Sequence, residues 1–235
     1  FPHPYRRRSI TRLIHKTSPI PEPVDATTTD IEEKRALMVG SGFFVTPTVV
    51  ATANHLVEGS DSIVVKFNGN TTGAVIRTRD KRNDIALLTV EAASLGGSPI
   101  IPLAVGDPAD TLEGDRLVAS GYASPTAPRP SVALLVVNSL FGTDDDLTQF
   151  TLSTSLGKVA IGGPVIDTSN RVVGIALPAD TSSTEATHVA MKANLLADLL
   201  KLSSLDSAPA PEPSPDGLDA TLLGQMARSA VVLIE

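Results

Sequence analysis

Cysteine and tryptophan are absent from this 235-residue chain, and aromatic residues make up only 3% of it. Without cysteine, the chain has no disulfide framework, no cysteine-based metal site and no cysteine nucleophile. Few aromatic rings leave little for nucleic-acid bases to stack on, and the net charge of −7 disfavours polyanions, so we expect no nucleic-acid partner. Because no apolar run reaches about 18 residues, we also predict no membrane span.

Histidine is scarce as well, which bears on metal binding. The four histidines are His3, His15, His55 and His188, and no two have the i,i+4 or His-x-His spacing of a preformed site. We therefore predict neither a metal centre nor a cofactor. Two alternatives stay open: a site that folding would assemble from His55 and His188, and a hard cation held by the acidic run 144–146.

Short apolar runs are what the chain has in abundance. Hydrophobic residues make up 42% of it, and runs of strand length are separated by Gly, Pro, Asn and Asp. Two series of about six runs predict two antiparallel β lobes, and Asn68-Gly69-Asn70 predicts a tight hairpin turn. The expected strands are 36–39, 42–45, 49–52, 62–67, 73–76 and 85–90, then 117–120, 131–137, 149–152, 164–166, 172–176 and 188–191.

Charge and proline mark the parts outside the lobes. Residues 1–16 carry +5, which leaves −12 for the remainder. Leucines spaced on one face predict an amphipathic helix over 193–202. A strand at the far end of the chain, over 229–235, needs a sheet to join. The expected units are a basic arm and linker over 1–36, a two-lobed domain over 37–202, a Pro-rich linker over 203–218, and a helix and strand over 219–235.

One combination of residues carries a recognisable chemistry. A histidine follows a strand, an aspartate heads another strand 29 residues later, and a Gly-Gly-Pro turn comes 78 residues after that aspartate. The motifs are Gly40-Ser41-Gly42-Phe43, His55, Asp84-Ile85-Ala86-Leu87-Leu88, Gly114-Asp115-Arg116 and Gly162-Gly163-Pro164. In this order they resemble the HtrA-type, trypsin-like serine proteases. The resemblance implies an all-β fold, a double six-stranded β-barrel with a C-terminal helix and a terminal extension strand.

The resemblance also implies roles for residues of the triad. In such proteases the histidine removes the proton of the nucleophile, the aspartate orients the imidazole, and backbone N–H groups stabilise the oxyanion. His55 and Asp84 match the first two roles. The family loop reads Gly-x-Ser-Gly-Gly-Pro, and aligning it here puts Ile161 at the serine and Val159 at the first glycine. Ala160 and Gly162 complete a degenerate oxyanion loop.

Both changes predict a loss of catalysis. Ile161 has no heteroatom with which to attack a carbonyl. Val159 is β-branched and resists the positive φ that glycine permits, which disturbs the oxyanion hole. We therefore interpret the chain as a catalytically inactive relative, a pseudoprotease that binds a peptide or protein in the cleft between the lobes or serves as a regulatory or assembly module. The expected binding residues on the walls of the cleft are Ser153, Thr154, Ser155 and His188.

Alternative functions are an active serine-type endopeptidase with a non-standard nucleophile among the hydroxyls at 153–155, a protease fold repurposed for metal binding, and a purely structural interaction module. The resemblance implies an extracytoplasmic location, periplasmic or secreted, and homo-oligomerisation is left open.

Family members usually enter the first barrel with an apolar strand that residues 25–34 lack. We expect the strand at 231–234 to supply that barrel edge, in cis or from a neighbouring copy.

Overall fold

The structure is a computed structural model that describes residues 39–97, 99–153, 160–179, 187–209 and 220–235. The arm and linker expected over 1–36 lie outside these residues, as do most of the strand expected at 36–39 and the second half of the Pro-rich linker. Val159, Thr154 and Ser155 also lie outside them. In the described part, no helix is long and apolar enough to cross a membrane.

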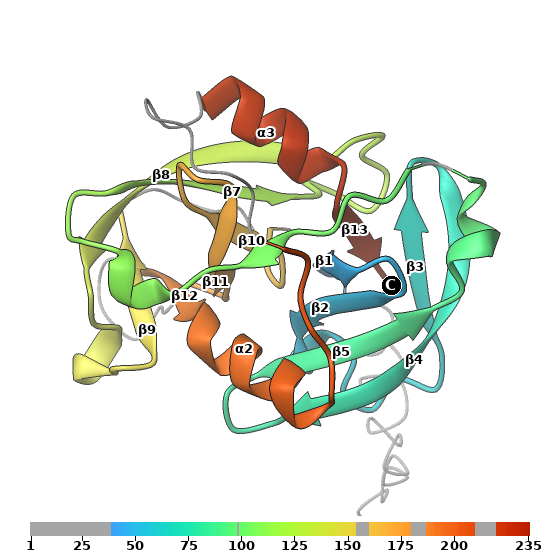
Figure 1. The fold of residues 1–235 in the computed structure, drawn as a ribbon, viewed down its shortest axis with the longest axis horizontal. Helices are drawn as coiled ribbons and strands as arrows, with labels where there is room; N and C mark the ends of the chain where they lie inside the picture. The colour runs from blue at the N-terminus through green and yellow to red at the C-terminus, as the bar shows by residue number, and fades with distance from the viewer. Residues whose placement is uncertain (1–38, 98, 154–159, 180–186, 210–219) are drawn as a thin grey trace, which may run out of the picture. The chain divides into compact units, whose positions relative to one another are not determined.

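Six antiparallel strands form a first closed barrel (Figure 1). Its hairpin turn at Asn68 and Gly69 has φ angles of 48° and 83°, as the Asn-Gly sequence predicts. In the order in which they pair, its strands are β1 (Gly40–Thr46), β13 (Val231–Ile234), β3 (Ile63–Phe67), β4 (Asn70–Asp80), β5 (Ile85–Val90) and β2 (Val49–Ala53).

A second sheet closes through the pairing of β10 with β11, so the predicted double-barrel, all-β fold is confirmed. A short strand, β6 (Ala104–Val105), adds to β11 in parallel. The strands of this barrel, in order, are β10 (Pro164–Ile166), β7 (Arg116–Gly121), β8 (Ser131–Ser139), β9 (Gln149–Leu152), β12 (His188–Lys192) and β11 (Arg171–Ala176).

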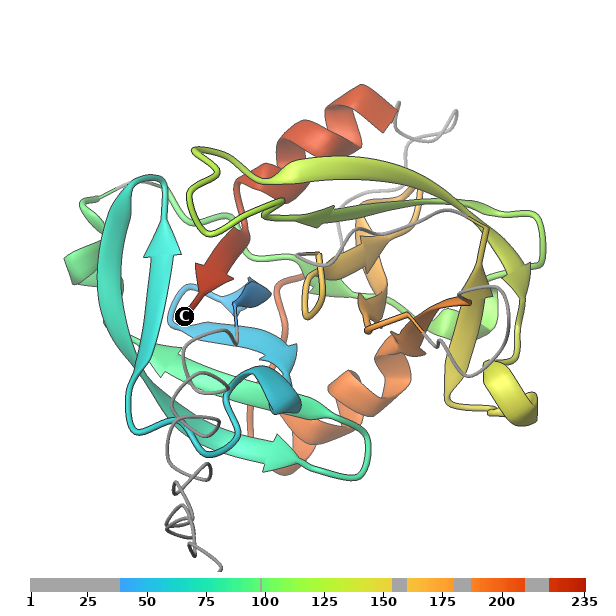
Figure 2. The same cartoon turned by 180° about the vertical axis from the view of Figure 1, so that it is seen from behind.

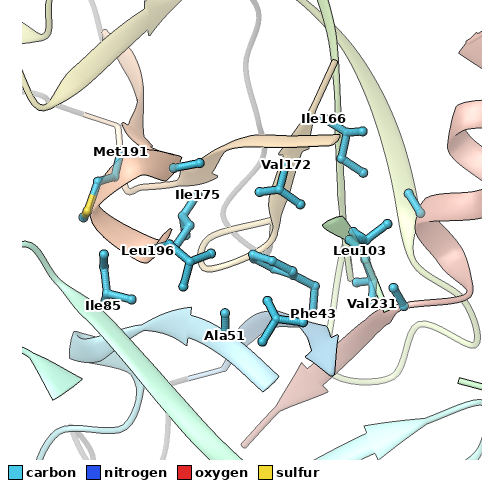
Figure 3. Close-up of a cluster of buried hydrophobic side chains, with 14 of the residues drawn as sticks. Phe43, Ala51, Ile85, Leu103, Ile166, Val172, Ile175, Met191, Leu196 and Val231 are labelled. Atoms are coloured by element: carbon cyan, nitrogen blue, oxygen red, sulfur yellow. The ribbon is translucent and has the colours of Figure 1, made fainter. Parts of the chain in front are cut away.

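Three clusters of buried side chains hold the fold together. One fills the first barrel and includes Phe44 and Phe67, whose rings meet edge to face with centroids 5.3 Å apart. Another fills the second barrel around Phe150. The largest lies between the barrels, and Figure 3 shows Phe43 of β1 facing Ile175 of β11 there. The barrels are therefore packed on each other through a continuous apolar layer.

Two helices complete the domain. The amphipathic pattern over 193–202 forms α2 (Ala193–Leu202), which buries Leu196, Leu199 and Leu200 while Leu202 stays 84% exposed. The second helix is α3 (Ala220–Arg228), which lies along β7 and β8 (Figure 2). From α3 the chain runs into β13, between β1 and β3, so the terminal strand pairs in cis.

Some strand boundaries differ from those expected. β4 runs over 11 residues instead of the four expected at 73–76, because polar residues such as Thr71, Arg77 and Arg79 leave its two ends without an apolar run. β1 begins at Gly40, two residues before the expected 42–45, and Val39 is in no strand. The two residues of β6 are too few to leave a periodic pattern.

Candidate functional site

Strand pairing brings His55 and Asp84 together. His55 lies in a short 3₁₀ turn, η1 (Asn54–Leu56), directly after β2, and Asp84 directly precedes β5. Because Ala53 of β2 is opposite Ile85 of β5, the end of one strand adjoins the start of the other. The two predicted residues are therefore neighbours in the structure.

The imidazole and carboxylate of this pair are firmly joined. His55 Nδ1 lies 2.6 Å from Asp84 Oδ2, and the backbone N–H of His55 donates to Asp84 Oδ1 at 2.7 Å. Since an ionised carboxylate only accepts hydrogen bonds, Nδ1 carries the proton and Nε2 of the neutral ring is left as the acceptor. The side chains are 33% and 28% exposed. The geometry is that of a general base with its orienting group.

A hydrogen-bonded turn directly precedes Asp84, whose backbone is unusual, and the sequence reasoning missed both features. Asp84 has a φ of 53°, a left-handed conformation that aspartate tolerates better than most residues. Asp80 accepts hydrogen bonds from the backbone N–H groups of Arg82 and Asn83 and from the Asn83 side chain. Burial works to raise the pKa of Asp80, but these hydrogen bonds outweigh it and lower the pKa below 3.8. These hydrogen bonds therefore stabilise the folded state at pH values above the ordinary pKa of an aspartate. This stabilisation is lost as the pH falls through the lowered pKa of Asp80.

The loop around Ile161 is joined to the first barrel by its backbone. The carbonyl of Ile161 accepts a hydrogen bond from the N–H of Ser41 at 2.8 Å, and Gly162 donates to the carbonyl of Ala176 at 2.8 Å. Gly162 has a φ of 80°, and a Cβ added there would lie 2.3 Å from the Ser41 carbonyl oxygen and 2.6 Å from Thr52 Oγ1. Only glycine fits this position.

Ser41 connects three parts of the site through three of its atoms. Its N–H holds Ile161, its carbonyl accepts from Thr52 Oγ1 at 2.7 Å, and its Oγ accepts from the N–H of Tyr122 at 2.9 Å. Thr52 is on the strand that leads to His55, and Tyr122 follows β7 of the second barrel. This fully buried serine therefore fixes the loop relative to both barrels.

Comparison with known proteins decides the family of this arrangement. Residues 40–175 match the model of the trypsin-like peptidase domain, and this match spans more than half of the chain. The chain belongs to the trypsin-like peptidase domain family. The match includes β1, His55, Asp84 and the loop at Ile161, so all parts of the site described above lie in the family region.

Relatives of this trypsin-like domain are larger proteins. The chain is 33% identical over 188 residues to the anti-sigma-I factor RsgI9 of Acetivibrio thermocellus, covering 77% of the chain and 24% of that protein. It is 30% identical over 149 residues to a probable periplasmic serine endoprotease, DegP-like, of Halomonas elongata, covering 61% and 30%. The chain thus spans less than half the length of these curated relatives.

A solved structure shares the fold. The HtrA-type protease AlgW with decapeptide superposes with a TM-score of 0.58 at 18% identity, covering 70% of this chain and 51% of that one. This likeness shows that the two chains share the double-barrel fold.

The side chains of the Ile161 loop in the trypsin-like domain are apolar and enter different cores. Ile161 is half-buried and packs against the first-barrel cluster, which includes Leu56, the residue after His55. Ala160 packs against the second-barrel cluster. A Cβ on Gly121 would lie 2.5 Å from the Ala160 Cα, so the loop is also pressed against β7. Two apolar side chains, those of Ala160 and Ile161, therefore occupy this part of the loop.

Two of the expected binding residues lie at one end of the β9–β12 pair. His188 opens β12 opposite Leu152, and Ser153 follows Leu152 directly. Ser153 is exposed and donates its N–H to the carbonyl of Val136, while His188 is half-buried. Among the residues that the structure describes, no group of three His, Asp or Glu side chains is placed to hold a metal ion.

Alanine at position 162 should destabilise the trypsin-like domain much more than alanine at Gly59. Both glycines have positive φ, which costs a non-glycine residue about 1–2 kcal/mol. A Cβ at Gly59 meets nothing within 4 Å, whereas one at Gly162 meets the Ser41 carbonyl and adds an overpacking cost of about 1–3 kcal/mol. Urea unfolding of Gly162→Ala and of the matched control Gly59→Ala measures the difference. Equal losses would contradict the close packing of the loop on β1.

Proposed function

We propose that this trypsin-like domain is catalytically inactive and binds an extended peptide or protein segment beside the His55–Asp84 pair. One observation carries the proposal: the loop joined to Ser41 presents isoleucine where the family nucleophile would stand. A hydrocarbon side chain has no lone pair to attack a carbonyl and no proton for His55 to remove. Asp84 orients the His55 ring, but the side chain at position 161 has no hydroxyl proton for that ring to remove.

Nearby hydroxyl groups do not replace the missing nucleophile in this proposal. Ser41 and Thr52 are fully buried, Thr52 Oγ1 donates to the Ser41 carbonyl, and Ser41 Oγ accepts from Tyr122. Ser153 is exposed, but it follows β9 in the second barrel, eight residues before Ile161. Reaction at any of these hydroxyls would need the site to be rebuilt.

Binding is the function that the remaining groups support. The His55 ring is one-third exposed, and its Nε2 can accept a hydrogen bond from a ligand N–H while Asp84 holds the ring in place. The HtrA-type relative of like fold was solved with a decapeptide, which favours a peptide as the class of ligand. A regulatory or assembly role outside the cytoplasm fits such a module, and the DegP-like relative is described as periplasmic.

Fluorescently labelled, unfolded casein tests this proposal by fluorescence anisotropy, with gel electrophoresis of the same samples. We expect saturable binding without cleavage. Ser153→Trp should weaken binding about tenfold, which corresponds to about 1.4 kcal/mol, by crowding the proposed site. The matched control Leu202→Trp, on the exposed end of α2, should bind like the natural chain.

Two other results would each replace the proposal. Cleavage of casein that disappears in His55→Ala would establish a hydrolase with a non-standard nucleophile. No binding of casein by the folded chain would favour a purely structural module in which His55 and Asp84 are relics.

A further inference from the structure

The first barrel is not made from one continuous stretch of chain. Five of its strands lie between Gly40 and Val90, and the sixth, β13, comes from residues 231–234 after the whole of the second barrel. Without β13, β1 and β3 would both be open edges of a five-stranded sheet. We refer to the gap between β1 and β3, which β13 fills, as the strand slot.

Backbone hydrogen bonds hold β13 in the strand slot on both sides. Four residues of β13 are in register with β1, from Gly40 opposite Ile234 to Phe43 opposite Val231. On the other side, Val64 and Glu235 exchange N–H to carbonyl bonds at 2.8 and 2.9 Å. The Lys66 ammonium also lies 2.6 Å from the Glu235 carboxylate. The slot therefore recognises a strand by its backbone and by one acidic side chain directly after it.

The side chains of β13 show what kind of strand the slot accepts. Val232 and Ile234 point into the core of the first barrel, while Val231 and Leu233 join the layer between the barrels, where Figure 3 shows Val231 close to Leu103. All four are at most 1% exposed. Both faces of the strand are thus buried, so an occupant must be apolar on both faces.

The segment that carries β13 leaves β1 and returns to it at adjacent residues. Ala208 donates its N–H to the carbonyl of Val45, and the carbonyl of Ala230 accepts from the N–H of Phe44. Between them, α3 packs Leu223 and Ala227 into the layer between the barrels. The tether before α3 contains Pro209, Pro211, Pro213 and Pro215. Proline-rich linkers generally act as semi-rigid spacers.

We propose that residues 220–235 are an exchangeable strand donor, which fills the strand slot of a second copy of this chain and so forms a strand-exchanged dimer. Every contact of α3 and β13 described above is the same when the acceptor is another copy, so only the path of the tether distinguishes the two forms. A short tether gives the donor an effective concentration in the millimolar range. We therefore expect the exchanged dimer when copies refold together at millimolar concentration. In dilute solution we expect the monomer.

Introduced cysteines test the exchange, because the natural chain has none. Val64→Cys and Glu235→Cys place two partly exposed thiols on directly opposite residues, a separation that a disulfide spans. The chain with both substitutions should close an internal disulfide. Two tagged chains with one substitution each, refolded together at millimolar concentration and oxidised, should form a covalent heterodimer. Non-reducing electrophoresis measures both products.

The matched control replaces Glu235→Cys with Leu202→Cys, an exposed position on α2. We expect about tenfold more heterodimer from the Val64→Cys and Glu235→Cys mixture than from the control mixture, since only the slot raises the local thiol concentration. Equal yields from the two mixtures, with the internal disulfide formed in the double variant, would overturn the exchange. Failure of the double variant to close its internal disulfide would overturn the pairing on which the proposal rests.

Discussion

Aspartate in place of Val232 is expected to leave the chain largely unfolded. The Val232 side chain is fully buried in the first-barrel cluster, opposite Gly42, where a carboxylate finds no cationic partner among its apolar neighbours. Burying an unpaired charge, or leaving the strand slot empty to avoid it, should cost more than about 4 kcal/mol, a large part of a typical stability of about 5–15 kcal/mol. Circular dichroism and urea unfolding measure the loss.

The same substitution at an exposed apolar residue is the matched control. Leu222 of α3 is 44% exposed, and Leu222→Asp should change the free energy of unfolding by no more than about 0.5 kcal/mol. If Val232→Asp were as stable as this control, β13 could not be closing the first barrel in solution.

Serine at position 161 together with glycine at position 159 is expected to produce a chain that reacts with a fluorophosphonate probe. The His55–Asp84 pair is already in the geometry of a base and its orienting group, and Gly162 and Ser41 already hold the loop. The double variant restores the attacking oxygen and the glycine of the family loop. Ile161→Ser alone should react about 10²–10³-fold more slowly, because loss of one oxyanion donor costs that much.

Two further variants control this experiment. Adding His55→Ala to the reactive variant should abolish labelling, since it removes the base that Asp84 orients. Ile161→Ala should not label, because it opens space without supplying an oxygen. A folded double variant that stays unreactive would contradict the inference that the nucleophile and the glycine are the missing parts of the site.

Sequence patterns were enough to predict those features that depend on local chemistry or on motif order. His55 and Asp84 follow and precede strands at the family spacing, and the structure pairs them within 2.6 Å. The hairpin at 68–70 and the helix at 193–202 follow from Asn-Gly turn chemistry and leucine spacing. In each case a few neighbouring residues determine the local conformation.

Features that depend on distant backbone groups could not be predicted. Each hydrogen bond of Ser41 to Ile161, Thr52 or Tyr122 has a main-chain group on at least one side, and the partners are 11 to 120 residues away in the chain, so no local pattern indicates the pairing. The apolar run at 231–234 indicated a strand that needed a sheet, but its register on Gly40 and Val65 required the structure.

The inactivity of the natural site is the central claim, and labelling by a fluorophosphonate probe tests it most directly. The natural chain and His55→Ala are incubated with the probe side by side, and labelling is followed over time. Because Ile161 offers no nucleophilic oxygen, we predict the same background labelling in both chains. Labelling of the natural chain that disappears in His55→Ala would show a working nucleophile beside the His55–Asp84 pair and would contradict the account.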